Sequence, residues 1–121
     1  MEQKNIKIGK FEIGNKLPLS IIAGPCQIES REHAIMIAGK MVEITKKLGI
    51  NYIFKASFDK ANRTSINGAR GVGLEEGMRT FAEIKKLYPD LPIVTDKFRI
   101  DNRVRAIQNN CLFYYRPYLV K

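Results

Sequence analysis

Apolar and polar residues first alternate along this chain and then recur at helical spacing. Residues 6–13 alternate around Gly9 and Lys10, which predicts a short β-hairpin with a two-residue turn. Residues 19–23 are mostly apolar and end at Gly24, a pattern typical of a strand buried on both faces of a parallel sheet. The chain therefore begins with a hairpin and then enters a larger fold.

Two later segments carry apolar residues at helical spacing. The first follows Ser30, an expected N-cap, and stops at Gly49, which predicts a helix over residues 31–48. In the second, apolar residues recur from Leu74 to Leu87 before a Pro-Asp pair stops the pattern. Each helix is long enough to cross over between parallel strands.

Residues 52–57 and 91–96 are predicted to be the second and third strands of the sheet. The order of hairpin, strand, helix, strand, helix, strand predicts a parallel α/β fold. A doubly wound sheet or a (β/α)8 barrel can begin this way. No dinucleotide or P-loop glycine fingerprint follows the first strand, and the pattern favours the barrel.

Composition is that of one globular domain. The 121 residues are 45% hydrophobic and 27% charged, and no apolar run approaches the length of a membrane helix. The N-terminus lacks the apolar core of a secretory signal, so a cytoplasmic protein without a membrane partner is expected. Cys26 and Cys111 are expected to be reduced thiols.

The formal charge of +9 is unevenly distributed. Residues 1–96 hold 15 Lys and Arg against 11 Asp and Glu, whereas residues 97–121 hold 6 against 1. This distribution argues against a basic surface built for nucleic acid. A small basic protein that binds nucleic acid through its arginine- and tyrosine-rich tail stays as an alternative.

Unusual polar residues follow the predicted strands at the end where α/β folds bind ligands. The segment after the second strand combines cations with hydroxyl and amide groups, which suits a phosphate or carboxylate ligand, although a solvated basic loop would have the same composition. Lys55 favours the ligand, because an ammonium at the end of an apolar strand must reach a partner or water. The residues concerned are Lys55, Lys60, Asn62, Arg63, Thr64, Ser65 and Arg70.

Cys26 ends the first strand's Gly-Pro-Cys turn, where a thiolate could bind a metal or act as a nucleophile. A lone cysteine is more often a small buried hydrophobe. His33 is expected to be an ordinary surface residue, and Glu29 to favour the helix N-terminus. One histidine and no neighbouring second cysteine cannot assemble a closed zinc site.

Residues 22–30 and 54–65 together resemble the signature of the 3-deoxy-D-manno-octulosonate-8-phosphate synthases, also called 2-dehydro-3-deoxyphosphooctonate aldolases. Residues 70–77 and 94–96 also fit that family. The aromatic-pathway heptulosonate-phosphate synthases share the Gly-Pro-Cys turn but have Lys-Pro-Arg-Thr-Ser in place of Lys-Ala-Asn-Arg-Thr-Ser. They stay as a second alternative.

The resemblance implies an α/β fold that is the N-terminal portion of a (β/α)8 TIM barrel preceded by a β-hairpin, and a homo-oligomer. It implies a transferase that condenses phosphoenolpyruvate with arabinose 5-phosphate and releases phosphate, for lipopolysaccharide synthesis. We expect a hairpin over residues 1–16, three βα units over 17–96 and a divergent basic tail over 97–121. The abrupt change after Asp96 suggests a frameshift or premature stop, so an incomplete barrel with little activity is expected.

The resemblance also implies roles for single residues. Lys55 and Lys60 would contact phosphoenolpyruvate and the reacting centre, with Lys60 and Asn62 catalytic and Asn62 orienting the sugar. Arg63 and Thr64 would bind the sugar phosphate, Thr64 standing where many relatives have serine. Cys26 matches a ligand of the divalent metal in the metal-dependent class, whose other ligands lie on later strands.

Overall fold

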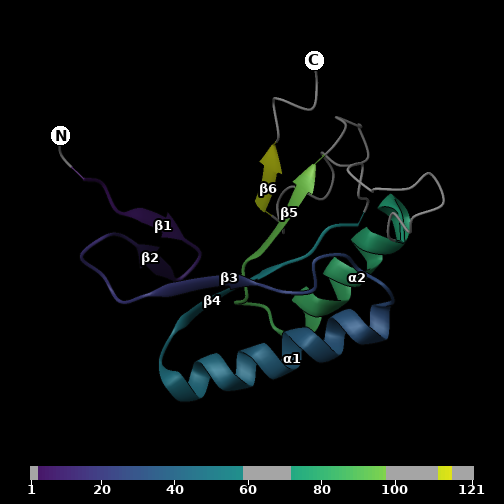
Figure 1. The fold of residues 1–121 in the computed structure, drawn as a ribbon, viewed down its shortest axis with the longest axis horizontal. Coiled ribbons are helices and arrows are strands. Elements are labelled where there is room, and N and C mark those ends of the chain that lie inside the picture. Colours follow the sequence, from purple (N-terminus) through teal and green to yellow (C-terminus); the bar gives the residue numbers. More distant parts are fainter. Residues whose placement is uncertain (1–2, 59–71, 98–111, 116–121) are drawn as a thin grey trace.

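The computed structural model describes residues 3–58, 72–97 and 112–115, in which strands and helices alternate along the chain (Figure 1). This order confirms the mixed α/β class. None of the described helices is long and apolar enough to span a membrane. The elements are β1 (Ile6–Ile8), β2 (Phe11–Ile13), β3 (Ser20–Ala23), α1 (Arg31–Leu48), β4 (Asn51–Lys55), α2 (Leu74–Leu87), β5 (Ile93–Lys97) and β6 (Leu112–Tyr115).

Four strands form one parallel sheet in the consecutive order β3-β4-β5-β6. The register places Ala23 opposite Phe54 and Lys55 opposite Val94. α1 and α2 lie side by side (Figure 1) and contribute to the same core. A doubly wound sheet would reverse its strand order at a switch point. Among the described strands the order does not reverse.

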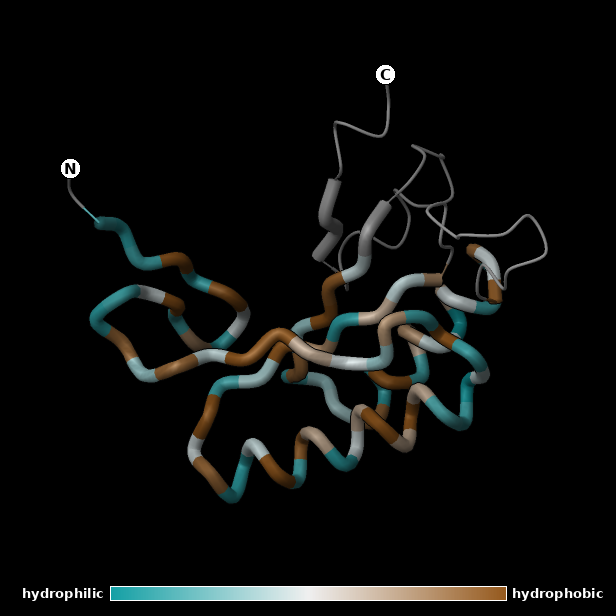
Figure 2. Tube along the Cα trace, viewed as in Figure 1, coloured by the Kyte–Doolittle hydropathy of each residue, from teal (hydrophilic) through white to brown (hydrophobic). Residues whose placement is uncertain are grey.

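Both helices begin and end at the predicted residues, and in α1 local chemistry sets both ends. At the start of α1 the Ser30 hydroxyl accepts a hydrogen bond from the His33 amide at 3.1 Å. At its end Gly49 adopts a left-handed conformation with φ of 67°, which glycine adopts without steric cost. Hydrophobic and hydrophilic residues alternate along the trace of α1 (Figure 2), as an amphipathic helix requires.

The hydrophobic core lies between the two helices and one face of the sheet. Phe54 of β4 and Phe81 of α2 are both fully buried. Ala34 and Ala38, which have small side chains, are the residues by which α1 packs closely on this core. Tyr52 and Phe54 belong to this core, whereas Lys55 is on the opposite face because strand side chains alternate. The sheet therefore has one face covered by helices and one that carries Lys55.

The strand boundaries differ from the predicted ones by up to two residues. Leu19 is 70% exposed and precedes β3, and β4 ends at Lys55, two residues before the predicted end. β5 begins at Ile93 and continues to Lys97. β6 adds a fourth strand, in a segment where the sequence pattern predicted no element. Its only partner among the described strands is β5, which lies earlier in the chain, so the pairing is not visible in the local sequence.

The hairpin lies at the end of the sheet where its strands begin. β1 and β2 pair antiparallel around a turn at Gly9, and Lys10 forms an ion pair with Asp90 at 3.0 Å. A cavity of about 450 Å³ at this end of the fold is lined by Phe11 of the hairpin and by residues at and after the C-terminal ends of α1 and α2, among them Val42, Tyr52 and Leu87. The hairpin is thus on the opposite end from the candidate ligand groups.

Replacing Phe81 by alanine should destabilise the protein by about 3–5 kcal/mol, because it leaves a cavity between α2 and the sheet. Leu87→Ala, on the same helix but 53% exposed, should cost far less. Urea unfolding followed by circular dichroism measures both. Equal losses would contradict the core described here.

Candidate functional site

The loop after β3 and the end of β4 pack against each other without room for a side chain between them. A Cβ atom at Gly24 would overlap the backbone carbonyl of Lys55. Farther along loop 24–30, the Ile28 amide donates to the Ser57 carbonyl at 2.8 Å, and Ile28 is fully buried. The two strand ends are therefore fixed relative to each other at the edge where the sequence places the candidate ligand residues.

Lys55 is the last residue of β4 and is only partly buried. The ion pairs found among the side chains that the structure describes do not include Lys55. A partly buried ammonium at a strand end suits an anionic ligand, because charge-assisted hydrogen bonds would stabilise it. Lys55 thus stays the strongest candidate of the site.

Cys26 is an exposed free thiol within loop 24–30. Within residues 3–58, 72–97 and 112–115, no group of three or more His, Cys, Asp and Glu side chains could hold a metal ion. His33, expected at the surface, is partly buried, and its Nδ1 lies 4.0 Å from the Glu29 carboxylate. A single thiol does not fit a metal site, so the described residues assign the metal no role.

The remaining predicted ligand groups lie outside the described residues, although both flanks of their segment, 59–71, are described. The Gly73 amide donates to the Phe58 carbonyl at 2.9 Å, which joins the two flanks. Gly77 packs so closely on Phe58 that a Cβ atom there would overlap the ring-bearing side chain. These predicted groups are Lys60, Asn62, Arg63 and Thr64.

Tyr52 of β4 bonds to the end of the neighbouring strand β3. The sequence pattern did not identify it as a residue of the site. Its hydroxyl donates to the Ala23 carbonyl at 2.7 Å, directly before Gly24. Burial raises the pKa of Tyr52 from 10.0 to about 12. A tyrosine in an otherwise apolar strand is the signal that could have revealed it, because a buried hydroxyl needs a partner.

Comparison with known proteins gives both a family and named relatives. Residues 2–107 match the model of the DAHP synthetase I family. The 2-dehydro-3-deoxyphosphooctonate aldolase of Rickettsia canadensis is 54% identical over 94 residues, which cover 78% of this chain and 34% of the relative. The protein of the same name from Rickettsia bellii is 53% identical over 94 residues, which cover 78% of this chain and 34% of the relative. The one from Bartonella tribocorum is 52% identical over 91 residues, which cover 75% of this chain and 32% of the relative. The chain spans about a third of the length of these curated relatives.

Gly24→Ala should cost about 3 kcal/mol or more, because its methyl group meets backbone that cannot move without breaking the strand pairing. Gly49→Ala is the matched control. It has open space around it and should cost about 1 kcal/mol, for its left-handed conformation alone. Urea denaturation gives both values. A smaller loss at Gly24 than at Gly49 would contradict the close approach of the strands.

Tyr52 should make the folded state lose stability as the pH rises from about 10 to about 12, because the unfolded chain releases the tyrosine proton first. Below this window Tyr52→Phe should be less stable by about 1 kcal/mol, having lost the bond to Ala23. The difference should shrink across the window. Urea unfolding of both proteins at several pH values measures it, and a constant difference would contradict the assignment.

Proposed function

Because the chain belongs to the DAHP synthetase I family, we propose that it forms the first strand ends of a 2-dehydro-3-deoxyphosphooctonate aldolase. The observation that carries this proposal is the 54% identity to a protein of that name over 94 residues, which is 78% of this chain. The whole enzyme would condense phosphoenolpyruvate with arabinose 5-phosphate in the cytoplasm, for lipopolysaccharide synthesis.

The reaction requires like charges to be held together. The enol carbon of phosphoenolpyruvate bonds to the sugar aldehyde carbon, water adds at the neighbouring carbon, and inorganic phosphate leaves. Two phosphates and a carboxylate approach each other in this step, so cations must offset their repulsion and fix the reacting atoms. Lys55 supplies one such cation from the end of a rigid strand.

The other roles extend the same proposal along the chain. In it, Lys60 and Asn62 act on the reacting atoms, while Arg63 and Thr64 bind the sugar phosphate. Cys26 would contribute one ligand to a divalent metal whose other ligands come from outside the described residues.

The consecutive strand order supports a (β/α)8 barrel as the complete architecture. In such a barrel each strand lies beside the next along the chain, with helices outside and ligands at the carboxyl ends of the strands. Lys55 and loop 24–30 are at that end, and the hairpin is at the other. We further propose that the complete enzyme is a homo-oligomer.

A chimera gives the most direct test of the proposed function. The 94 matching residues of the Rickettsia canadensis relative are replaced by those of this chain, and phosphate release from phosphoenolpyruvate is measured. We expect release that depends on arabinose 5-phosphate and is much slower with erythrose 4-phosphate. Preference for erythrose 4-phosphate would favour the aromatic-pathway activity, and inactivity of the folded chimera would contradict the proposal.

In the same chimera Lys55→Ala should lower the rate about 100-fold or more, because a cation that stabilises the developing charge is lost. Lys47→Ala removes an exposed lysine whose partner is Glu43, and it should leave the rate unchanged. Steady-state kinetics with both substrates measure the effect. Equal rates for the two variants would show that Lys55 has no role in the reaction.

A further inference from the structure

The cavity at the hairpin end of the fold has the size and the lining of a small-molecule site. Its volume of about 450 Å³ falls in the range of roughly 300–1,000 Å³ that is typical of ligand pockets. Most of the side chains that line it are apolar. Aliphatic residues such as Val42 and Leu87 share the wall with the aromatic rings of Phe11 and Tyr52. Size and lining therefore suit a small molecule with an apolar body.

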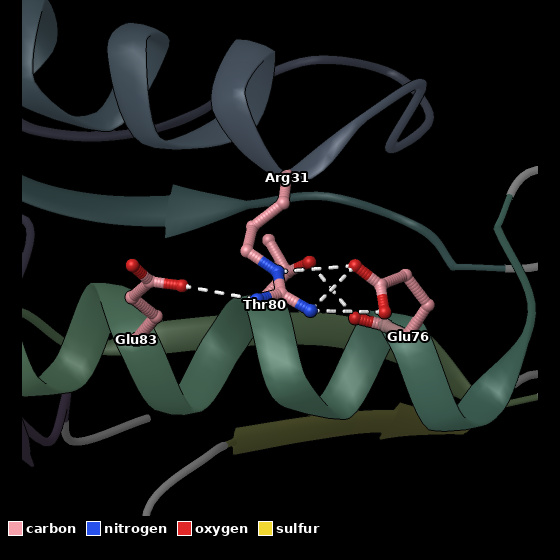
Figure 3. Close-up of polar contacts among 4 residues, drawn as sticks. All are labelled: Arg31, Glu76, Thr80 and Glu83. Carbon is pink, nitrogen blue, oxygen red and sulfur yellow. Dashed lines mark hydrogen bonds and ion pairs between the residues drawn. The ribbon is translucent and has the colours of Figure 1, made fainter.

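Bonds within the protein hold the walls of this cavity in place. The C-terminal ends of α1 and α2 form two of the walls, and Arg31 joins the beginnings of the same helices. Its Nη2 atom lies 2.8 Å from Oε1 of Glu76 (Figure 3). After α2, the Lys85 ammonium donates to the backbone carbonyls of Pro89 and Leu91 at 3.3 and 2.9 Å. The cavity is thus formed before a ligand enters, which lowers the entropic cost of binding.

The charged groups at the cavity have an excess of positive charge. Asp90, which contributes a carboxylate to the lining, is paired with Lys10 at 3.0 Å. Lys46 also lines the cavity, and the ion pairs found among the described side chains do not include it. The Lys85 ammonium is bonded to the wall through carbonyl groups, which carry no net charge. A ligand with one negative charge therefore complements the cavity better than a cation does.

Phe11 brings the hairpin into the wall of the cavity. β1 and β2 pair with each other and form a sheet separate from that of β3 to β6. The ion pair between Lys10 and Asp90 joins the hairpin to the main fold, but its side chains are 77% and 69% exposed, and such pairs contribute little in water. A ligand that contacts both Phe11 and Leu87 would therefore strengthen a weak connection.

We propose that this cavity binds a medium-chain alkyl carboxylate, whose chain packs between Phe11 and Leu87 and whose carboxylate pairs with Lys46. A flexible chain adapts to a wall that mixes aliphatic side chains, prolines and aromatic rings. The cavity lies where the strands of the sheet begin, whereas Lys55 is at the carboxyl end of β4. The site is therefore separate from the ligand groups of the proposed function and does not depend on that function.

Titration of the chain with octanoate, followed by nuclear magnetic resonance, tests the ligand class. We expect saturable binding with a Kd of about 1 mM or below, and contacts from the octanoate methylene groups to the Phe11 ring and the Leu87 methyl groups. Hexanoate should bind about five-fold more weakly, because it buries two fewer methylene groups. Octanol, which lacks the charge, should bind about ten-fold more weakly. No saturable binding, or contacts at other residues, would overturn the proposal.

Two substitutions at exposed positions test the residues of the site. Lys46→Gln should weaken octanoate binding about ten-fold and leave octanol binding unchanged. Lys47→Gln is the matched control, because Lys47 is in the same last turn of α1 but is paired with Glu43, and it should change neither affinity. Leu87→Trp, at a position that is 53% exposed, should fill the cavity and remove the binding of both molecules. Equal effects of the two lysine substitutions, or full binding to Leu87→Trp, would overturn the proposal.

Amide hydrogen exchange measures the connection between the hairpin and the main fold. Saturating octanoate should slow the exchange of the β1 and β2 amides about five-fold or more, and it should have no such effect in Leu87→Trp. Lys55→Ala removes the candidate anion site at the other end of the sheet and should leave octanoate binding unchanged. Loss of binding in Lys55→Ala would place the octanoate at that end and overturn the proposal, as would unchanged exchange of the hairpin amides.

Discussion

The close approach of two parallel strands at their carboxyl ends is the constraint on which the candidate site depends. At Gly24 the chain lies against the Lys55 carbonyl, where no side chain fits, and then turns so that the Ile28 amide reaches Ser57. A bulkier residue would separate the strands and move Lys55 away from loop 24–30. Because parallel strands bring their carboxyl ends to the same edge, this one contact places loop 24–30 beside the end of β4.

Two kinds of contact meet at this edge. The helix-covered face buries Phe54, whereas its neighbour Lys55 is a partly buried cation on the opposite face. Burying a charge costs stability unless a partner of opposite charge or water reaches it. The Tyr52 hydroxyl on Ala23 and the Arg31 guanidinium on Glu76 tie the neighbouring segments together by bonds that do not involve Lys55.

The helices were predictable to the residue, and the strands were not. Ser30 and Gly49 carry their capping function in their own side-chain and backbone chemistry, so the ends of α1 follow from local sequence. The end of β4 depends on where β5 stops pairing with it, and β6 exists only as a partner of β5. The residues at which a strand begins and ends depend on the strand that it pairs with, and the local sequence pattern does not specify that partner.

By itself the sequence determined the alternation of strands and helices, the cations after the second strand, and the Gly-Pro-Cys turn at Cys26, because each is a matter of residue type and spacing. Only the tertiary structure decided which distant groups meet. Nothing in the spacing of Arg31 and Glu76, 45 positions apart, or of Tyr52 and Ala23, 29 apart, indicates that they bond. Such contacts arise from how helices pack on a sheet, which depends on the whole core rather than on any segment of it.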